Sequence, residues 1–242
     1  MGDLDDIRVK IARAGEHLHE LGRRLDDFAK SKPYSIVVET DPQTGDQLFK
    51  IDREPERPPD LPVIGDVLYN LRSALDHLAW QLVIKAGGSP NSRTALPIFN
   101  DSAKFHGPCA QAKMAGMNSA MQVAIQNHQP CFGRNANRNQ ALWSLEEYGN
   151  IDKHRRPLLV PISTQDMLWS PGGHPVHIHK GPVYKDTILV RFPPTQQQSQ
   201  LNAMPSVAFD EPPAAGEDVK HFLSLVEYVV ASLVDEFEAA FF

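Results

Sequence analysis

The sequence predicts an α+β fold in which a helical bundle of four or five helices carries a small antiparallel β-sheet. In long segments at both ends and in the middle of the chain, apolar residues recur at steps of three and four, as in amphipathic helices. Between these segments lie short runs rich in β-branched residues, bounded by Pro, Gly and polar residues. The chain has 242 residues, 41% of them hydrophobic, and no flexible linker divides it. We therefore expect one domain, residues 1–242, with a full core.

Five segments are expected to form the helical core. Residues 1–30 carry a continuous apolar stripe, and residues 61–86 carry the most regular one, a seam made of Ile64, Leu68, Leu71, Leu75, Leu78 and Leu82. Residues 109–127 and 139–155 are more weakly amphipathic but are also expected to be helical. Residues 217–241 close the chain with a further apolar face.

The β segments are expected at residues 34–52 and 157–210. In the first, two β-rich runs flank Asp41–Asp46, whose Pro, Gly and Asp residues favour a turn, so the sequence predicts a hairpin. The second holds four short β-rich runs separated by Pro, Gly and Gln residues. Together they predict the small sheet.

Charge and composition limit the classes of partner. The 24 Lys and Arg residues against 30 Asp and Glu give a formal charge of -6, which argues against a protein that coats nucleic acid and leaves room for a local basic site. The two cysteines, Cys109 and Cys131, fit a reducing compartment, although one bridge between them stays open. The charged N-terminus and the lack of a long apolar run predict a cytoplasmic protein without membrane contact.

The segment 61–86 has a polar face opposite its leucine seam. Asp66, Asn70, Ser73 and His77 fall within about 60° of one another on a helix with 100° per residue. Such a face can simply meet water. Asn and Ser are weak helix formers that are better suited to specific hydrogen bonds, and this composition favours a site.

The segment 139–155 carries a similar face. Trp143, Glu147, Asn150 and His154 follow one another at steps of four, three and four. Basic residues after this face also suit a helix C-terminus and need no further role. If the two faces meet, they would place two imidazoles and several carboxylates in one interhelical cleft.

Two kinds of chemistry remain open for such a cleft. Histidine titrates near neutral pH, so the cleft would suit proton transfer. Alternatively, His77, His154, Asp66 and Glu147 could bind a divalent transition metal if three or four of them converge. No established metal-binding motif is present to favour the metal.

Two helices resemble those of a widespread group of uncharacterised bacterial proteins. The matching segments are Asn70–His77, with the sequence NLRSALDH, and Asn150–Arg155, which has the pattern NxDKHR. Leu96–Phe99 and Gln129–Pro130 also fit the pattern of this group, so the resemblance covers residues 60–160. It implies no function by itself.

The chain also resembles the HEPN superfamily of small helical proteins, many of them metal-independent ribonucleases. Their motif is an Arg and a His separated by four to six residues on a helix, and Arg72 and His77 match it with Asp76 between them. The resemblance implies that His77 is a general base toward a ribose 2′-hydroxyl and that Arg72 stabilises charge on phosphorus, often at a homodimer interface. The spacing of Arg72 and Asp76 independently predicts an ion pair between them.

These observations lead to three hypotheses about function. The first is a HEPN-like nuclease, a hydrolase of RNA that needs no cofactor and uses a site made of His77, Arg72, His154, Asn70, Asn150 and Arg155. In it the histidines are acid–base groups, the arginines face phosphate and the asparagines orient the substrate. The second is a metal-dependent enzyme that acts on a small molecule. The third is a non-catalytic binding protein whose polar residues fix the packing of its helices.

Overall fold

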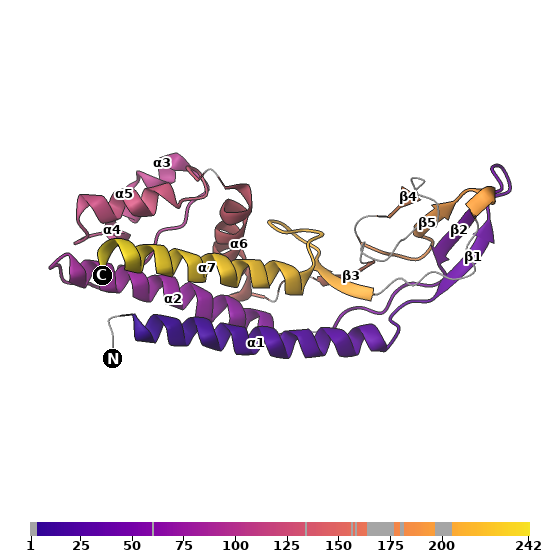
Figure 1. Ribbon diagram of the computed structural model, residues 1–242, viewed down its shortest axis with the longest axis horizontal. Helices are drawn as coiled ribbons and strands as arrows, with labels where there is room; N and C mark the ends of the chain where they lie inside the picture. Colours follow the sequence, from indigo (N-terminus) through magenta and orange to yellow (C-terminus); the bar gives the residue numbers. More distant parts are fainter. Residues whose placement is uncertain are drawn as a thin grey trace. The chain divides into compact units, whose positions relative to one another are not determined.

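The fold is α+β, as the sequence predicts, in a computed structural model that describes residues 4–59, 61–133, 135–155, 157, 159–163, 177–179, 182–196 and 205–242. The chain divides into two compact units (Figure 1). The first consists of residues 1–21, 61–157 and 220–242, and the second of residues 22–60 and 158–219. The expected helical segments lie mainly in the first unit and the β segments in the second. That the whole chain is one domain stays a prediction.

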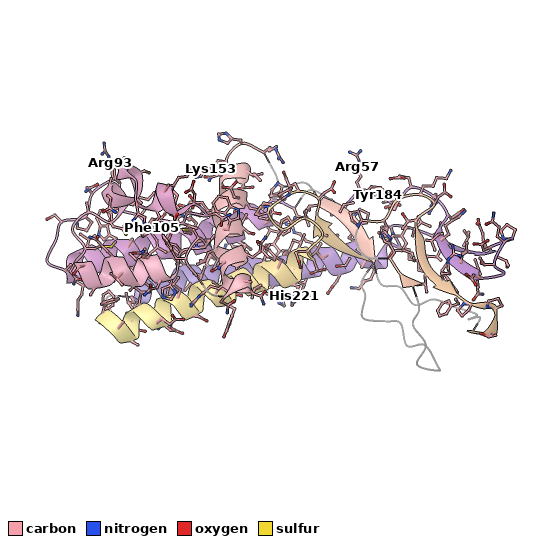
Figure 2. All side chains as sticks on the ribbon, turned by 90° about the horizontal axis from the view of Figure 1, so that it is seen from above. Arg57, Arg93, Phe105, Lys153, Tyr184 and His221 are labelled. Carbon is pink, nitrogen blue, oxygen red and sulfur yellow. The ribbon has the colours of Figure 1, made fainter. Side chains whose placement is uncertain are left out.

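Three long helices form the body of the first unit. They are α1 (Asp5–Lys30), which belongs to this unit as far as Leu21, α2 (Val63–Lys85) and α7 (Val219–Phe241). These helices run side by side in the first unit (Figures 1 and 2). Arg8 of α1 pairs with Asp235 and Glu238 near the end of α7, so these two helices are antiparallel.

Helix α2 is the centre of this packing. Its leucine seam is confirmed, because all six residues of the seam are buried, each exposing at most 1% of its surface. Further apolar residues around the helix are buried as well, among them Val63, Val67, Ala74, Ala79 and Val83. Helix α6 (Ala136–Asp152) packs against it. Near this contact a Cβ atom on Gly65 would lie 2.3 Å from Asp152 Oδ2, so any side chain there would require the carboxylate to move.

The prediction of one helix over residues 109–127 is wrong. The structure has two helices there, α4 (Pro108–Lys113) and α5 (Ser119–Asn127). Between them Gly116 adopts a φ of 90°, which ends a right-handed helix, and the Asn118 side chain accepts a hydrogen bond from the Met121 amide and starts the next one. A further short helix, α3 (Ser102–Phe105), was not predicted.

The helix expected over residues 139–155 is shifted toward the N-terminus. Helix α6 begins at Ala136, where Asn135 caps it by accepting a hydrogen bond from the Arg138 amide, and it ends at Asp152. His154 and Arg155 therefore lie in the turn that follows α6 and not on the helix.

Among its described residues, the second unit contains two antiparallel sheets. One has the strand order β1-β2-β5-β4 and the other pairs β3 with β6. The strands are β1 (Ile36–Thr40), β2 (Gln47–Ile51), β3 (Leu159–Ser163), β4 (His177–Ile178), β5 (Ile188–Phe192) and β6 (Pro205–Phe209), with a 3-10 turn at Pro194–Gln196. The predicted hairpin is confirmed as β1 and β2.

The turn of this hairpin contains the Pro, Gly and Asp residues that predicted it, and the structure adds an apolar core in the same unit. Asp41 accepts hydrogen bonds from the amides of Gln43 and Thr44, and Arg191 of β5 pairs with Asp41 and Asp46 at 2.9 and 3.1 Å. The unit has its own apolar core, made of Tyr34, Phe49, Ile51, Val183, Leu189, Val190 and Phe192.

Within the described ranges, every helix is too short or too polar to cross a lipid bilayer.

Candidate functional site

The first unit contains a hollow of about 560 Å3 between α2 and α6. Its wall combines charged and polar side chains from both helices with parts of two other segments. The lining residues are Gly65, Leu68, Tyr69, Arg72, Ser73, Asp76 and His77 from α2, Leu145, Glu146, Gly149, Asn150 and Asp152 from α6, and Ala95, Lys113 and Lys153. The two helices that carry the predicted polar faces therefore do border one hollow.

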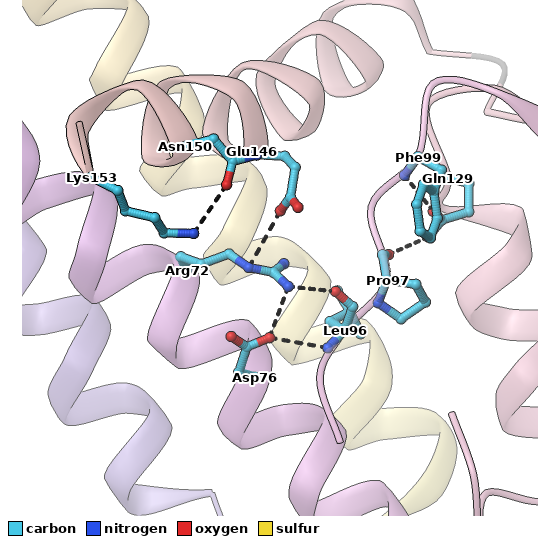
Figure 3. Close-up of polar contacts among 9 residues, drawn as sticks. All are labelled: Arg72, Asp76, Leu96, Pro97, Phe99, Gln129, Glu146, Asn150 and Lys153. Atoms are coloured by element: carbon cyan, nitrogen blue, oxygen red, sulfur yellow. Dashed lines mark hydrogen bonds and ion pairs between the residues drawn. The ribbon is translucent and has the colours of Figure 1, made fainter. Parts of the chain in front are cut away.

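Arg72 is held on several sides at this hollow (Figure 3). Its Nη2 donates to the Leu96 carbonyl at 2.7 Å and lies 2.9 Å from Asp76 Oδ1, while its Nε lies 3.5 Å from Glu146 Oε2. The ion pair expected between Arg72 and Asp76 is confirmed. Among the described residues, the buried Nη1 atom has no hydrogen-bond partner. The guanidinium thus uses its Nη2 and Nε atoms for contacts within the protein.

Asp76 completes this arrangement. Its Oδ1 also accepts a hydrogen bond from the Leu96 amide at 3.1 Å, so Arg72 and Asp76 together bind both backbone polar groups of Leu96. Burial raises the pKa of the Asp76 carboxyl, and Glu146 adds to this effect, whereas Arg72, the Leu96 amide and Lys113 oppose it. The two side chains act as a clamp on the chain at Leu96.

A second side chain fixes the same segment three residues further on. The Gln129 side chain is buried, its Oε1 accepts from the Phe99 amide at 3.0 Å, and its Nε2 donates to the Pro97 and Ile125 carbonyls at 2.8 and 3.2 Å (Figure 3). All four segments that carry the first resemblance therefore have residues at the hollow or beside it. Arg72, Asp76 and Gln129, from two of these segments, hold residues 96–99 in place.

His77 is the predicted residue with the clearest place at the hollow. Its side chain is exposed, and it lines both this hollow and a neighbouring one of about 340 Å3 that also includes Trp80. Asp76 is shared by the two hollows as well. His77 therefore lies where two adjoining cavities meet.

The two predicted asparagines differ in position. Asn150 is exposed, lines the hollow and accepts a hydrogen bond from Lys153 Nζ at 3.0 Å. Asn70 is buried, and its side-chain amide donates to the Asp66 carbonyl one turn earlier on α2. Only Asn150 is placed to orient a ligand, because Asn70 is not among the residues that line the hollow.

The remaining predicted residues are not brought to this hollow. His154 and Arg155 are exposed in the turn after α6, and neither is a lining residue. Asp66 is exposed on α2 outside the lining, and Glu147 instead lines a third hollow of about 380 Å3 beside Phe99. The structure thus joins His77 with Asn150 but does not place both imidazoles in one cavity.

The metal alternative requires three or four converging ligands. Within the part of the chain that the structure describes, no group of three or more His, Cys, Asp and Glu side chains is arranged to hold a metal ion. His77, His154, Asp66 and Glu147 therefore do not form the ligand set that this alternative needs.

The sequence missed several residues that form the wall. Glu146 of α6 and Lys153, the C-cap residue after this helix, lie seven positions apart, and residues at i and i+7 lie on the same side of a helix. The predicted face of residues 139–155 is rotated by about one residue position from the face that lines the hollow. Gly149 lies at the centre of the lining face, and because it has no side chain it gave no signal of that face in the sequence. Lys113 belongs to a different helix, so no periodicity could have linked it to α2.

Comparisons of the chain with protein-family models, with curated proteins and with solved structures found no match. The two resemblances described above stay predictions.

Proposed function

We propose that the chain is a metal-independent ribonuclease that acts by acid–base chemistry at the hollow between α2 and α6, in the manner of the HEPN superfamily. The observation that supports this proposal best is the exposed imidazole of His77 in a hollow that Lys113 and Lys153 also line. An imidazole exchanges protons near neutral pH, and ammonium groups attract phosphate. The proposal includes a homodimer and a cytoplasmic location, where the free thiols of Cys109 and Cys131 would stay reduced.

In the proposed reaction His77 accepts the proton of a ribose 2′-hydroxyl. The 2′-oxygen then attacks the neighbouring phosphorus, the bond from phosphorus to the 5′-oxygen breaks, and the 5′-oxygen takes a proton from imidazolium or water. The products are a 2′,3′-cyclic phosphate and a 5′-hydroxyl. Lys113 and Lys153 stabilise the charge that develops on the phosphoryl oxygens, and Asn150 orients the substrate.

This assignment differs from the roles predicted for the motif arginine. Arg72 is bound to Leu96, Asp76 and Glu146, so we assign it a positioning role in place of direct contact with phosphate. The proposal makes no use of Asn70, His154 or Arg155, because they do not line the hollow.

A second function, non-catalytic binding, is favoured by the same network. The clamp made by Arg72 and Asp76 on Leu96 gives the most distinctive residues of the motif a structural task. A binding protein would keep the hollow and its ligand but would not need the imidazole of His77.

The test is incubation of the purified chain with labelled single-stranded RNA in the presence of EDTA. We expect cleavage that His77→Ala abolishes, and no cleavage of DNA of the same sequence, which lacks the 2′-hydroxyl. His19→Ala is the matched control, because His19 is exposed on α1 and lines none of these three hollows. RNA that stays intact, or cleavage that survives His77→Ala, would refute the proposal, and RNA bound without cleavage would favour the second function.

A further inference from the structure

The exposed face of α2 carries two aromatic side chains, one on each side of His77 in the sequence. Tyr69 exposes 68% of its surface and Trp80 exposes 43%. They lie eleven positions apart, which is three turns and about 20°, so both project from nearly the same side of the helix, about 16 Å apart along its axis. Large exposed aromatic rings on the most buried helix of the unit need an explanation.

Each ring belongs to one of the two hollows that meet at His77. Tyr69 lines the larger hollow, with Lys113 and Lys153, and Trp80 lines the smaller one, with Asp6 and Thr94. The positions of His77 and Asp76 in both linings make the two hollows neighbours. A ligand whose reacting group lies at His77 would therefore extend toward an aromatic ring in both directions.

The charges on this face indicate how such a ligand would lie. Lys10 Nζ is 5.5 Å from the centre of the Tyr69 ring, so one cation already adjoins that ring. The larger hollow is lined by three cations and three carboxylates, namely Arg72, Lys113 and Lys153 with Asp76, Glu146 and Asp152. The smaller hollow is lined by the carboxylates of Asp6 and Asp76, with no lysine or arginine among the described residues that line it. An anionic backbone would follow the lysine side, and only an uncharged base would enter beside Trp80.

We propose that Tyr69 and Trp80 are stacking platforms for two bases of a single-stranded RNA whose backbone passes His77. This inference rests on the proposed function, since it concerns the substrate of the same site. Proteins that bind single strands combine cations for the backbone with aromatic rings on which bases stack, and such stacking tolerates every base. The site would accordingly bind single-stranded RNA with little preference for sequence.

The test is the dissociation constant of a labelled single-stranded RNA in EDTA, measured by fluorescence anisotropy. Tyr69→Ala and Trp80→Ala should each weaken binding on the order of ten-fold, the usual loss for one stacked base. Tyr69→Phe and Trp80→Phe keep an aromatic ring and should bind nearly as the natural chain does. Tyr228→Ala is the matched control, because Tyr228 is 70% exposed on α7 and lines neither hollow.

An RNA of the same length without bases separates stacking from charge. We expect it to bind the natural chain and both alanine variants equally. Equal binding of ordinary RNA by all variants would overturn the inference, as would a complete lack of RNA binding, the result expected if a protein covers this face. RNA that binds through both rings but stays intact would refute only the proposed nuclease. Cleavage that depends on His77 but not on either ring would refute only the stacking platforms.

Discussion

Arg72 shows that a motif residue can serve the fold and border a site at once. The four-residue spacing on α2 predicted its ion pair with Asp76, because residues at i and i+4 are neighbours on a helix. Its contacts with Leu96 and Glu146 could not be predicted, since they join segments 24 and 74 positions away, where periodicity carries no information. The sequence therefore indicated the ion pair with Asp76 within α2 but not the contacts of Arg72 with Leu96 and Glu146.

Replacing this arginine should reduce stability as well as any activity. Arg72→Ala would leave two carboxylates and the Leu96 carbonyl without their common partner, and we expect a loss of about 2 kcal/mol in the free energy of unfolding. This lies below the usual loss for a buried pair because Arg72 and Glu146 still expose 19% and 20% of their side chains. Urea denaturation measures the change. A loss no larger than that of Arg13→Ala, which removes an exposed ion pair on α1, would contradict the clamp.

His128 should make the folded state sensitive to acid. Burial lowers the pKa of this histidine, Arg138 lowers it further, and Glu236 opposes both. A pKa that is lower in the folded state than in the unfolded state means that the contribution to stability is complete above the unfolded value of about 6.5. It is then lost as the pH falls through the folded value.

The test of this pH dependence is unfolding in urea at pH 7.5 and at about pH 5. His128→Gln, which cannot take up a proton, should narrow the difference in unfolding free energy between the two conditions. His19→Gln, at an exposed position, should leave the difference unchanged. An unaltered difference in His128→Gln would show that another group causes the acid sensitivity.

At the scale of elements, the strength of the sequence pattern decided what could be predicted. The leucine seam of residues 61–86 indicated α2 closely because its period reports a buried surface directly. Residues 109–127 gave a weaker pattern, and Gly116 and Asn118, which end one helix and start another, were not recognised as signals. The face of α6 that lines the hollow was missed for a related reason, since the weak amphipathicity of residues 139–155 allowed a face to be chosen that is rotated by about one residue position.

Gly116 should be the least replaceable residue in the connection between α4 and α5. Its φ of 90° disfavours any side chain, and a Cβ atom there would lie 2.8 Å from Val83 Cγ1. Gly87 is a matched control, because it has a φ of 78° and open space around its Cα. We expect Gly87→Ala to cost about 1 kcal/mol from strain alone, and Gly116→Ala to cost clearly more. Equal melting temperatures of the two variants would show that the contact with Val83 relaxes freely.

At the scale of the whole molecule, each unit has a core of its own. Phe49 is 2% exposed and lies in the core of the second unit, so Phe49→Ala should cost about 3 kcal/mol there. Hydrogen exchange would then quicken at amides of β2 and β5 but not at those of α2. Leu75→Ala in α2 is the reciprocal control. Faster exchange throughout the chain after either substitution would support the single domain predicted from the sequence.

The first unit is built from three stretches of chain, and the last of them, residues 220–242, contributes Phe222, Leu223, Val226 and Val230 to its interior. On the ribosome, the apolar surface of α2 would therefore be synthesised well before α7 can cover it. The second unit is complete once residue 219 has emerged. We expect the second unit to be able to fold first on the nascent chain, because the helices that border the hollow lack part of their packing until residues 220–242 have emerged.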